Sequence, residues 1–558
     1  MKNVLFVSLI VIILAGLFVM SCGKSTPTTT AAPTTTTSPA QTTAPATTPA
    51  TTPAATKTTP ATTPAATTPA AAQPQYGGTF IWVHNGGITQ IGAIVDNLGI
   101  AASRNTYPMF EGLLMTDEKD SIQPWLVTSW DVSADGKTIV FHLEENVKFQ
   151  DGTDFDAAAV QYNLEAVVKA NIGGTAFLKN VSSYEIPGKY TLKINLAKVD
   201  STFLLRLAQG ALGLMASPTA LQKPTTPETI AKVHSVGTGP FLFDSWQRDS
   251  FVKYKKWDGY RKKGVPYLDA IEIRNTADLT VSIMSLRAGE IHAVENVDPV
   301  DAKQLGNAGF TLYQPNLYFL HSIVPSGNNP NSPFAKKEVR LALEYAIDKK
   351  TIAQGVGMGY YEALNQVATS KDPWFNKDLP FREFNPEKAR QLLAQAGYPG
   401  GFNTTLVTDV MARRDTLTAI QTYLNNVGIK TTLKILDFGA AFGLPRQGWE
   451  GVYFPGFPNV GTLLGIQGRW GDPSTYISIY QPAGYWAKWD ALFAEMDAVK
   501  RTAILKDILK TIYDEAIGIP YQGDAPLVAM VPYLHGFAHH AFHVTSFWDP
   551  GKVWLGKK

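Results

Sequence analysis

The chain has 558 residues, of which 45% are apolar and 17% are charged, so it can bury a large core and wholesale disorder is excluded. The 49 basic and 47 acidic residues give a formal net charge of +2, which provides no electrostatic reason to expect a nucleic acid as partner. Cys22 is the single cysteine, so the chain forms no intramolecular disulfide and no cysteine-based metal site.

The first 22 residues have the character of a targeting segment. Lys2 precedes an apolar run from Val4 to Met20, and the run leads into Ser21 and Cys22. The ending Val-Met-Ser-Cys resembles a bacterial lipobox, whose cysteine is lipidated and becomes the new N-terminus. The alternative is an uncleaved anchor helix with an incidental cysteine. We expect a lipoprotein signal peptide at 1–22, lipidation of Cys22 and attachment to the membrane through that lipid.

Residues 23–75 form a second region of unusual composition. Of the 52 residues from Lys24 to Gln75, 45 are Thr, Pro or Ala, and none is aromatic. Such a segment buries too little apolar surface to offset the entropy of ordering it. The composition predicts a disordered linker that holds a folded domain, starting near Tyr76, away from a membrane surface.

The remaining residues, 76–558, alternate between strand and helix patterns. Strands are predicted at 79–83, 138–143, 191–196, 251–254 and 429–435 from runs of apolar residues next to turn signals. Helices are predicted at 155–170, 277–287, 336–354 and 416–426, and a further helix has Asn385 as its N-cap and ends at Gly397. This alternation favours an α/β fold with mixed sheets.

Four segments of this region carry a family resemblance. They are a Trp with a Ser-x-Asp-Gly turn and a Phe-x-Leu strand followed by Lys-Phe-x-Asp-Gly (130–152), a Gly-Thr-Gly-Pro turn (237–240), the helix motif Val-Arg-Leu-Ala-Leu-Glu-Tyr-Ala-Ile-Asp (339–348), and Asn-Pro through Ala-Gly-Tyr (385–398). In this order they resemble the extracytoplasmic solute-binding proteins of peptide/nickel-type ABC importers. Each motif has a structural explanation in turns and close helix packing, so the motifs indicate the fold and the general role rather than the ligand.

The resemblance implies an α/β, two-lobed periplasmic-binding-protein-like fold with mixed sheets and an extra subdomain on the first lobe. We expect a first lobe at 76–320 with its subdomain at about 112–225, a second lobe at 321–522, and a C-terminal return to the first lobe at 523–558. The chain would cross between the lobes near 318–325 and 519–524. The implied protein is a monomeric, extracytoplasmic receptor, without enzymatic activity or a cofactor, that delivers a peptide or similar solute to ABC permease subunits.

Two positions depart from the family pattern. Peptide-binding members often have an aspartate after a tryptophan in the second lobe, where it pairs with the ligand's amino group, but the corresponding stretch 448–459 has no Asp. Glu450 is a weak substitute because we expect it in a preceding strand. Members also usually have an Asp after Gly-Glu-Ile, where this chain has His292, which we interpret as structural. The ligand class therefore stays open between peptides and other solutes such as oligosaccharides.

The candidate ligand contacts lie in loops rich in aromatic residues, because aromatic side chains offer a large, stiff contact area between lobes. Such a loop is buried either by core or by ligand. The candidates are Trp449, Tyr453, Phe454 and Phe457 with the preceding Arg446, then Asn85 after the first strand, and Arg469 with Trp470 in a second loop.

The remaining functional signals are weak. His535, His539, His540 and His543 fall within nine residues, but the surrounding Pro, Gly and aromatic residues argue against a regular helix, so we expect surface or packing histidines and no metal. The chain lacks Gly-x-Ser-x-Gly, His-Glu-x-x-His and Walker sequences. The rival hypotheses are a tethered hydrolase, which would turn its ligand over, and a signalling receptor that contacts a sensor protein.

Overall fold

The computed structural model describes residues 73–558, except 85–86, 97–103, 118–120, 173, 210, 277, 316–318, 457–458, 538 and 543–544. The predicted signal peptide, the lipidation site Cys22 and the linker up to residue 72 lie outside the described residues. Within the described part of the chain, no helix is both long and apolar enough to span a membrane.

The first large sheet has seven strands in the order β12 (Thr311–Tyr313), β20 (Val528–Met530), β11 (Ala293–Val294), β1 (Thr79–His84), β10 (Ala270–Asn275), β9 (Phe251–Lys256) and β8 (Phe241–Gln247). Strand β1 runs parallel to β10 and β11, and the other pairs are antiparallel. The sheet is therefore mixed. The carboxyl ends of β1, β10 and β11 meet at one edge of it, where side chains from segments far apart in sequence come together.

A smaller four-stranded sheet, β4-β5-β7-β6, lies within this half of the chain, with bounds Val127–Val132, Thr138–Leu143, Thr191–Leu196 and Val181–Gly188. Helix α1 (Ala157–Lys169) packs on β7 and begins at Asp156, whose carboxylate accepts a hydrogen bond from the Ala159 N–H at 3.0 Å. The hairpin β2–β3 (Leu114–Thr116 and Ile122–Pro124) precedes it.

The Gly-Thr-Gly-Pro turn directly precedes β8 of the first large sheet and contacts the segment that follows β5. A Cβ atom on Gly237 would stand 2.2 Å from the Met109 carbonyl oxygen, so only glycine fits there. The Gln150 amide donates to the carbonyl oxygens of Gly239 and Phe241 at 3.0 and 2.8 Å. Two of the family motifs therefore hold each other in place.

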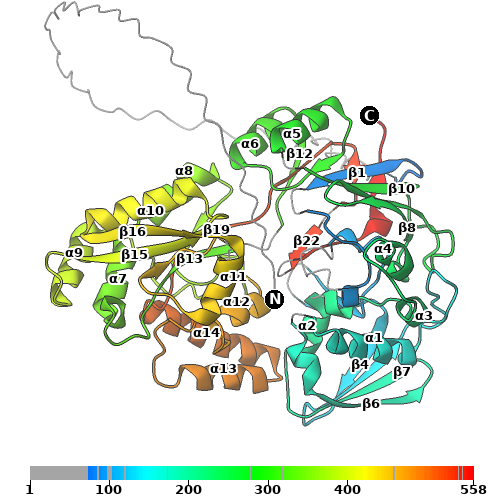
Figure 1. Ribbon diagram of the computed structural model, residues 1–558, viewed down its shortest axis with the longest axis horizontal. Helices are drawn as coiled ribbons and strands as arrows, with labels where there is room; N and C mark the ends of the chain where they lie inside the picture. The colour runs from blue at the N-terminus through cyan, green and yellow to red at the C-terminus, as the bar shows by residue number, and fades with distance from the viewer. Residues whose placement is uncertain are drawn as a thin grey trace, which may run out of the picture. The chain divides into compact units, whose positions relative to one another are not determined.

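The second large sheet is also mixed. Its order is β14 (Glu362–Ala363), β19 (Ile519–Asp524), β13 (Phe319–Pro325), β17 (Val452–Tyr453), β15 (Phe402–Asp409) and β16 (Ile429–Leu436), with β18 (Asn459–Val460) also paired to β13. Strand β15 is parallel to β16 and β17, whereas β13 and β19 are antiparallel. Helices α8 (Lys349–Gly357) and α10 (Arg414–Asn426) contact each other and pack on β19 and β16, as Figure 1 shows.

The other elements surround these sheets. The helices are α2 (Phe203–Gln209), α3 (Pro218–Leu221), α4 (Ile230–His234), α5 (Leu279–Ala288), α6 (Pro299–Asn307), α7 (Lys337–Ala346), α9 (Pro386–Gln395), α11 (Phe438–Gln447), α12 (Leu463–Trp470), α13 (Tyr485–Ala494) and α14 (Ala498–Asp514). Short 3₁₀ turns are η1 (Ile94–Asp96), η3 (Thr175–Asn180), η4 (Ala211–Gly213), η5 (Pro333–Ala335) and η6 (Pro550–Lys552). Two C-terminal pairs of strands are β21 (Leu534–His535) with β24 (Trp554–Leu555) and β22 (His539–Phe542) with β23 (Thr545–Trp548).

The prediction of one helix over 336–354 is wrong, because the chain forms α7 and α8 there with a break between them. Ile347 is extended, at φ −105° and ψ 121°, and ends α7. The Asp348 carboxylate then accepts the Thr351 N–H at 2.9 Å and caps the start of α8. An N-cap aspartate inside an apolar stripe therefore divides a pattern that periodicity alone reads as continuous.

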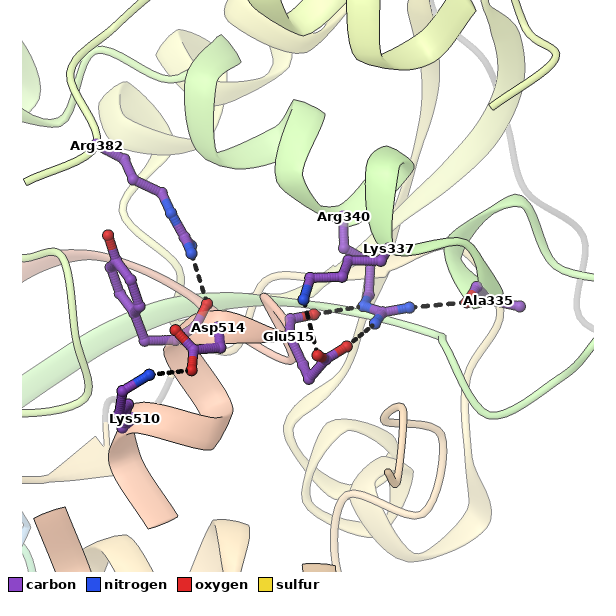
Figure 2. Close-up of polar contacts among 8 residues, drawn as sticks. Ala335, Lys337, Arg340, Arg382, Lys510, Asp514 and Glu515 are labelled. Carbon is purple, nitrogen blue, oxygen red and sulfur yellow. Dashed lines mark hydrogen bonds and ion pairs between the residues drawn. The ribbon is translucent and has the colours of Figure 1, made fainter. Parts of the chain in front are cut away.

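The arginine of the motif in α7 has a structural role (Figure 2). Arg340 is fully buried, and its guanidinium donates to the carbonyl oxygens of Ala335 and Glu515 at 2.9 and 2.8 Å. It also donates to the Phe334 carbonyl oxygen at 2.9 Å. The Glu515 carboxylate also accepts a hydrogen bond from Lys337 at 2.8 Å. Burial lowers the pKa of Arg340 to about 10. The motif therefore ties α7 to the residue that follows α14.

Candidate functional site

Strands β13 and β19 are the segments at which the sequence places the two crossings between lobes, and they pair side by side. His321 lies directly opposite Gln522 in this ladder, and Phe319 lies opposite Asp524. The His321 Nε2 atom and the Asp524 carboxylate are 3.0 Å apart, and both side chains are largely buried. Two residues about 200 positions apart in sequence thus form one polar pair at the end of the second sheet.

A loop after β17 lies against the loop after β15. The Asp409 carboxylate accepts hydrogen bonds from the backbone N–H groups of Met411 and Gly456, each at 2.8 Å. A Cβ atom on Gly456 would come within 2.0 Å of that carboxylate, so glycine permits the close approach. Asp409 therefore fixes both loops at the carboxyl ends of two parallel strands, the position where open α/β sheets place ligands.

These loops and the crossing strands enclose a small cavity of about 20 Å³. His321, Tyr521 and Gln522 line it from β13 and β19, and the rest of its wall comes from 412–416 and 454–456. Phe454 and Tyr521 are stacked, with ring centroids 5.8 Å apart and an interplanar angle of 22°. The cavity thus combines an aromatic face with polar side chains.

Arg413 brings a positive charge to the cavity wall. Its Nη1 atom donates to the Tyr361 hydroxyl at 3.1 Å, and its Nη2 atom is 3.7 Å from the Asp415 carboxylate. Burial raises the pKa of Tyr361 to about 12, and the nearby carboxylates of Asp524 and Asp298 contribute to the same shift. Asp298 is the N-cap residue of α6, between β11 and β12 of the first sheet, and its negative charge acts on Arg413, which follows β15 of the second sheet.

A second polar group lies at the carboxyl ends of β1 and β11. Arg104 donates to both carboxylate oxygens of Glu295, at 3.0 and 3.2 Å, and its other terminal nitrogen is 3.3 Å from His84 Nδ1. His84 Nε2 is 2.9 Å from the Asn105 side-chain oxygen. Burial, helped by the Arg104 charge, lowers the pKa of His84 to about 3, so the ring is neutral at physiological pH.

The two halves of the chain also meet away from the crossing strands. The Ser201 N–H donates to the Phe493 carbonyl oxygen at 3.1 Å, and Arg206 donates to the Gln467 side-chain oxygen at 2.9 Å. Leu205, on α2, belongs to an apolar cluster made mainly of residues from the second half. This contact lies between the segment 201–206 and the helices α12 and α13.

The aromatic candidates from the sequence are buried in packed surroundings. Trp449 is 6% exposed, its Nε1 donates to the Val324 carbonyl oxygen at 3.0 Å, and its ring contacts Tyr453 and Tyr476. Tyr453 and Trp470 belong to the same apolar cluster as Trp449. Of the aromatic candidates that the structure describes, Phe454 is the one that lines the cavity. Ligand contact for this group stays a prediction.

The charged and amide candidates are distributed more widely. Arg446 is exposed and lies over the Phe442 ring, with 6.0 Å from the guanidinium carbon to the ring centroid. Arg469 donates to the Tyr476 hydroxyl at 2.8 Å. Asn85 and Phe457 lie outside the described residues. Neither Arg446 nor Arg469 lines the cavity.

The histidines show packing roles where they are described. His292 Nδ1 accepts the Ile81 N–H at 3.0 Å, and burial lowers the pKa of His292 to about 4. His535 stacks on Trp554, with ring centroids 4.0 Å apart. The side chains of His539, His540 and His543 lie outside the described residues. Among the described residues, no group of three or more His, Cys, Asp or Glu side chains has metal-binding geometry.

Sequence reasoning missed the polar residues that the strands bring together, namely His84, Arg104, Glu295, His321, Arg413, Gln522 and Asp524. One signal was present: Gln522 and Asp524 follow the apolar run 517–521 at a predicted crossing. Because their partners are distant in sequence, spacing alone gives no reason to single them out.

Comparison with known proteins identifies the family. Residues 121–483 match the family model described as bacterial extracellular solute-binding proteins, family 5, middle region. The chain belongs to this family of solute-binding proteins, as the sequence motifs predicted.

A curated relative is the glutathione-binding protein GsiB of Shigella flexneri, which is 35% identical over 355 residues. The alignment covers 62% of this chain and 66% of the relative, just under two thirds of its length. The Escherichia coli K12 protein of the same name is also 35% identical over 355 residues, with the same coverage of both chains.

Solved structures share the fold at lower identity. HbpA2 from Haemophilus parasuis superposes with a TM-score of 0.73 at 22% identity, covering 86% of this chain and all of that one. The periplasmic binding protein DppA from Helicobacter pylori, in complex with the peptide STSA, gives a TM-score of 0.70 at 21% identity, covering 87% and 99%. The predicted two-lobed, mixed α/β fold is confirmed.

Proposed function

We propose that this chain is the substrate-binding receptor of an ABC importer and captures a peptide or similar small solute between its lobes. The observation that carries the proposal is the family match over residues 121–483. The polar groups at the strand ends support it, because they give both lobes charged side chains where such folds bind ligands.

We further propose the predicted lobe boundaries, 76–320, 321–522 and 523–558, with the subdomain at about 112–225. The membership of the two large sheets supports them, since β1 and β8 to β12 supply the first sheet, β13 to β19 the second, and β20 returns to the first. Strands β13 and β19 would then be the hinge. A solute closes such a hinge only to the extent that it binds the closed state better than the open one.

The cellular setting belongs to the same proposal. We propose a monomeric receptor on the outer side of the cell membrane, where it would meet ABC permease subunits. The lipobox-like ending at Cys22 and the Thr/Pro/Ala linker support its lipid anchoring there. Nucleotide hydrolysis would belong to other subunits, and the receptor itself would act by binding without catalysis or a cofactor.

Native mass spectrometry of protein purified without refolding tests the function. We expect a small solute to be retained, and we expect that solute to be recovered unchanged after prolonged incubation. Glutathione is the first defined probe, because the curated relatives are named for it. Conversion of the bound solute would favour the hydrolase. Signalling without any effect of the protein on solute uptake by cells would favour the sensor-coupled receptor.

A further inference from the structure

A wide groove of about 610 Å³ lies on the first half of the chain and shares no residue with the cavity beside the crossing strands. Its walls are residues 73–75, where the predicted linker ends, and parts of the C-terminal segment 532–558. The side chains that this segment contributes are mostly rings and cations, namely Tyr533, His535, Trp554, Lys557 and Lys558. None of the described residues that line the groove has a carboxylate side chain. The groove therefore suits a negatively charged group.

The aromatic character of this region continues to the start of the folded domain. The groove lies beside that start, since a Cβ atom on Gly78 would stand 3.5 Å from the Leu555 Cδ1 atom. Tyr76 is 65% exposed, and its hydroxyl donates to the Gly264 carbonyl oxygen at 3.0 Å. The Lys256 Nζ atom lies 5.6 Å from the centroid of the Tyr76 ring. An exposed ring with a hydroxyl beside a cation is typical of membrane–water interfaces, where the ring and its polar tip meet different surroundings.

Lysines gather around the same start of the domain. The residues at 262–263 are both lysine and directly precede Gly264, which accepts the tyrosine hydroxyl. Lys552 follows Gly551, on which a Cβ atom would lie 3.9 Å from Val265. Together with the cations of the groove they form what we call the basic surface, whose lysines are Lys256, Lys262, Lys263, Lys552, Lys557 and Lys558. All of these except the first are exposed.

The carboxylates in this region are fewer than the lysines, namely Asp258, Asp269, Glu290 and Asp549. Asp269 accepts the Gly78 N–H at 3.0 Å, and Asp549 lies 3.5 Å from Lys552. The whole chain has 49 basic and 47 acidic residues, so the local excess of lysine belongs to this surface and not to the overall composition. A surface with such an excess attracts a negatively charged partner.

The predicted linker joins the domain at this surface. Residues 23–75 are expected to tether the domain to the membrane, and an extended linker reaches about 3.1 Å per residue, so the domain stays within about 160 Å of its anchor. Tethering raises the effective concentration of the membrane surface, and a modest attraction is then enough for docking. Anionic lipid headgroups attract clusters of about four to eight basic residues close to a membrane. The number and position of these lysines match that requirement.

We propose that the basic surface docks on anionic phospholipid headgroups of the membrane to which the chain is tethered. Lys557 and Lys558 hold a headgroup phosphate at the groove, and Tyr76 rests at the interface. Docking keeps the domain close to the bilayer instead of at the full reach of its linker. This second, reversible membrane contact goes beyond solute capture, and it rests only on the membrane attachment in the proposed function.

Lysine footprinting of the full chain on vesicles tests the docking. The chain is attached through lipid on Cys22 or, if that cysteine is unmodified, through the apolar run from Val4 to Met20, and the mass of the protein shows which. The vesicles contain phosphatidylcholine alone or an equal mixture of phosphatidylcholine and phosphatidylglycerol. An uncharged amine reagent, read by mass spectrometry, measures how fast the lysines at 262–263 are modified. Lys430 and Lys434 are internal references, because they are exposed on β16, in the second large sheet.

Two double variants are compared with wild type. Lys557→Gln with Lys558→Gln removes two charges of the basic surface, and Lys430→Gln with Lys434→Gln is the matched control. Wild type and the control should show slower modification at 262–263 on the anionic vesicles than on phosphatidylcholine, and added salt should abolish the difference. The first variant should lower the ratio of docked to undocked protein by about fivefold for each lysine removed. Both variants should melt like wild type, since all four lysines are exposed.

The other outcomes overturn the inference. Equal modification on both kinds of vesicle, equal protection of Lys430 and Lys434, or full protection in the Lys557→Gln, Lys558→Gln variant would each refute docking through the basic surface. Protection by inorganic polyphosphate in solution, without protection by anionic vesicles, would assign the surface to a soluble polyanion instead. Retention of the solute, measured on the same samples by native mass spectrometry, keeps the two proposals apart: retention without docking leaves the receptor standing, and docking without retention counts against the receptor alone. If the chain attaches to neither kind of vesicle, docking and membrane attachment fail together.

Discussion

Replacing Trp449 by alanine separates two opposite expectations for the aromatic loop. If the tryptophan lines the ligand site, as the sequence suggested, its loss weakens binding and leaves the folded protein stable. The structure predicts the reverse, because the side chain is almost fully buried and its Nε1 donates to the Val324 carbonyl oxygen at 3.0 Å. The ring centroid of Trp449 also lies 5.2 Å from that of Tyr453 and 5.6 Å from that of Tyr476.

The magnitude follows from this environment. Truncating a buried tryptophan to alanine costs about 3–5 kcal/mol of unfolding free energy, since apolar contacts are lost and a cavity is left. Trp449→Phe keeps most of the ring and removes the bond to Val324, so it should cost about 1–3 kcal/mol. The matched control is Trp486→Ala, because Trp486 is only half-buried and bonds to Gln481 at 3.2 Å.

Thermal melting with and without solute measures both properties together. At about 100 times its dissociation constant, a solute adds about 2.7 kcal/mol of stability through linkage. We expect Trp449→Ala to lower the melting temperature of the free protein strongly while keeping the solute-induced gain. The reasoning is refuted if the free variant melts like wild type and the gain disappears, because Trp449 would then be a ligand contact.

The remaining predictions concern the fold, the closure and the anchor. Arg340→Met should destabilise the protein in denaturant unfolding by about 1–3 kcal/mol for each acceptor it leaves unsatisfied, because the buried guanidinium donates to the carbonyl oxygens of Phe334, Ala335 and Glu515. An unchanged midpoint would contradict this role, part of which Figure 2 shows. Folding lowers the pKa of His84 from 6.5 to about 3, so between these pH values the unfolded state binds a proton that the folded state does not, and the free energy of unfolding should fall as pH drops from 6.5 toward 3. His84→Gln should flatten that part of the curve of unfolding free energy against pH. An unaltered slope would count against the lowered pKa of His84. If the contact between 201–206 and the helices α12 and α13 forms only when the lobes close, Leu205→Ala should raise the dissociation constant of the retained solute several-fold in calorimetry. A lower melting temperature with unchanged affinity would show that the contact is present in both the open and the closed protein. Cys22→Ala should abolish lipid attachment in mass spectrometry while the folded domain keeps its melting temperature; a lipidated variant would disprove the lipobox.

Local sequence patterns predicted many of the individual elements. Asn385 was expected as an N-cap, and its side chain accepts the Lys388 N–H at 2.9 Å at the start of α9. The helix predicted at 277–287 corresponds to α5, which Gly289 ends with φ 73°. Such caps and stops depend on residues within one turn of each other, so adjacent sequence contains the necessary information.

The same local reasoning failed where a short-range cap competed with a long-range pattern. The apolar residues from Val339 to Ile347 have helical spacing, yet Asp348 caps a new helix directly after them. The periodicity reports which residues face the core, and both helices face it. It does not report whether the axis between them is continuous.

By itself, the sequence determined the family, the α/β class and the positions of most helices and strands, because capping, turns and apolar periodicity act over a few residues. Only the tertiary structure decided which polar side chains share a site. Gln522 meets His321 because β13 and β19 pair, and Arg104 meets Glu295 because segments nearly 200 residues apart converge at the edge of the first sheet. Burial was also decided in three dimensions: whether the indole of Trp449 packs against Tyr453 or faces a solute depends on what the fold lays over it, which no spacing along the chain encodes.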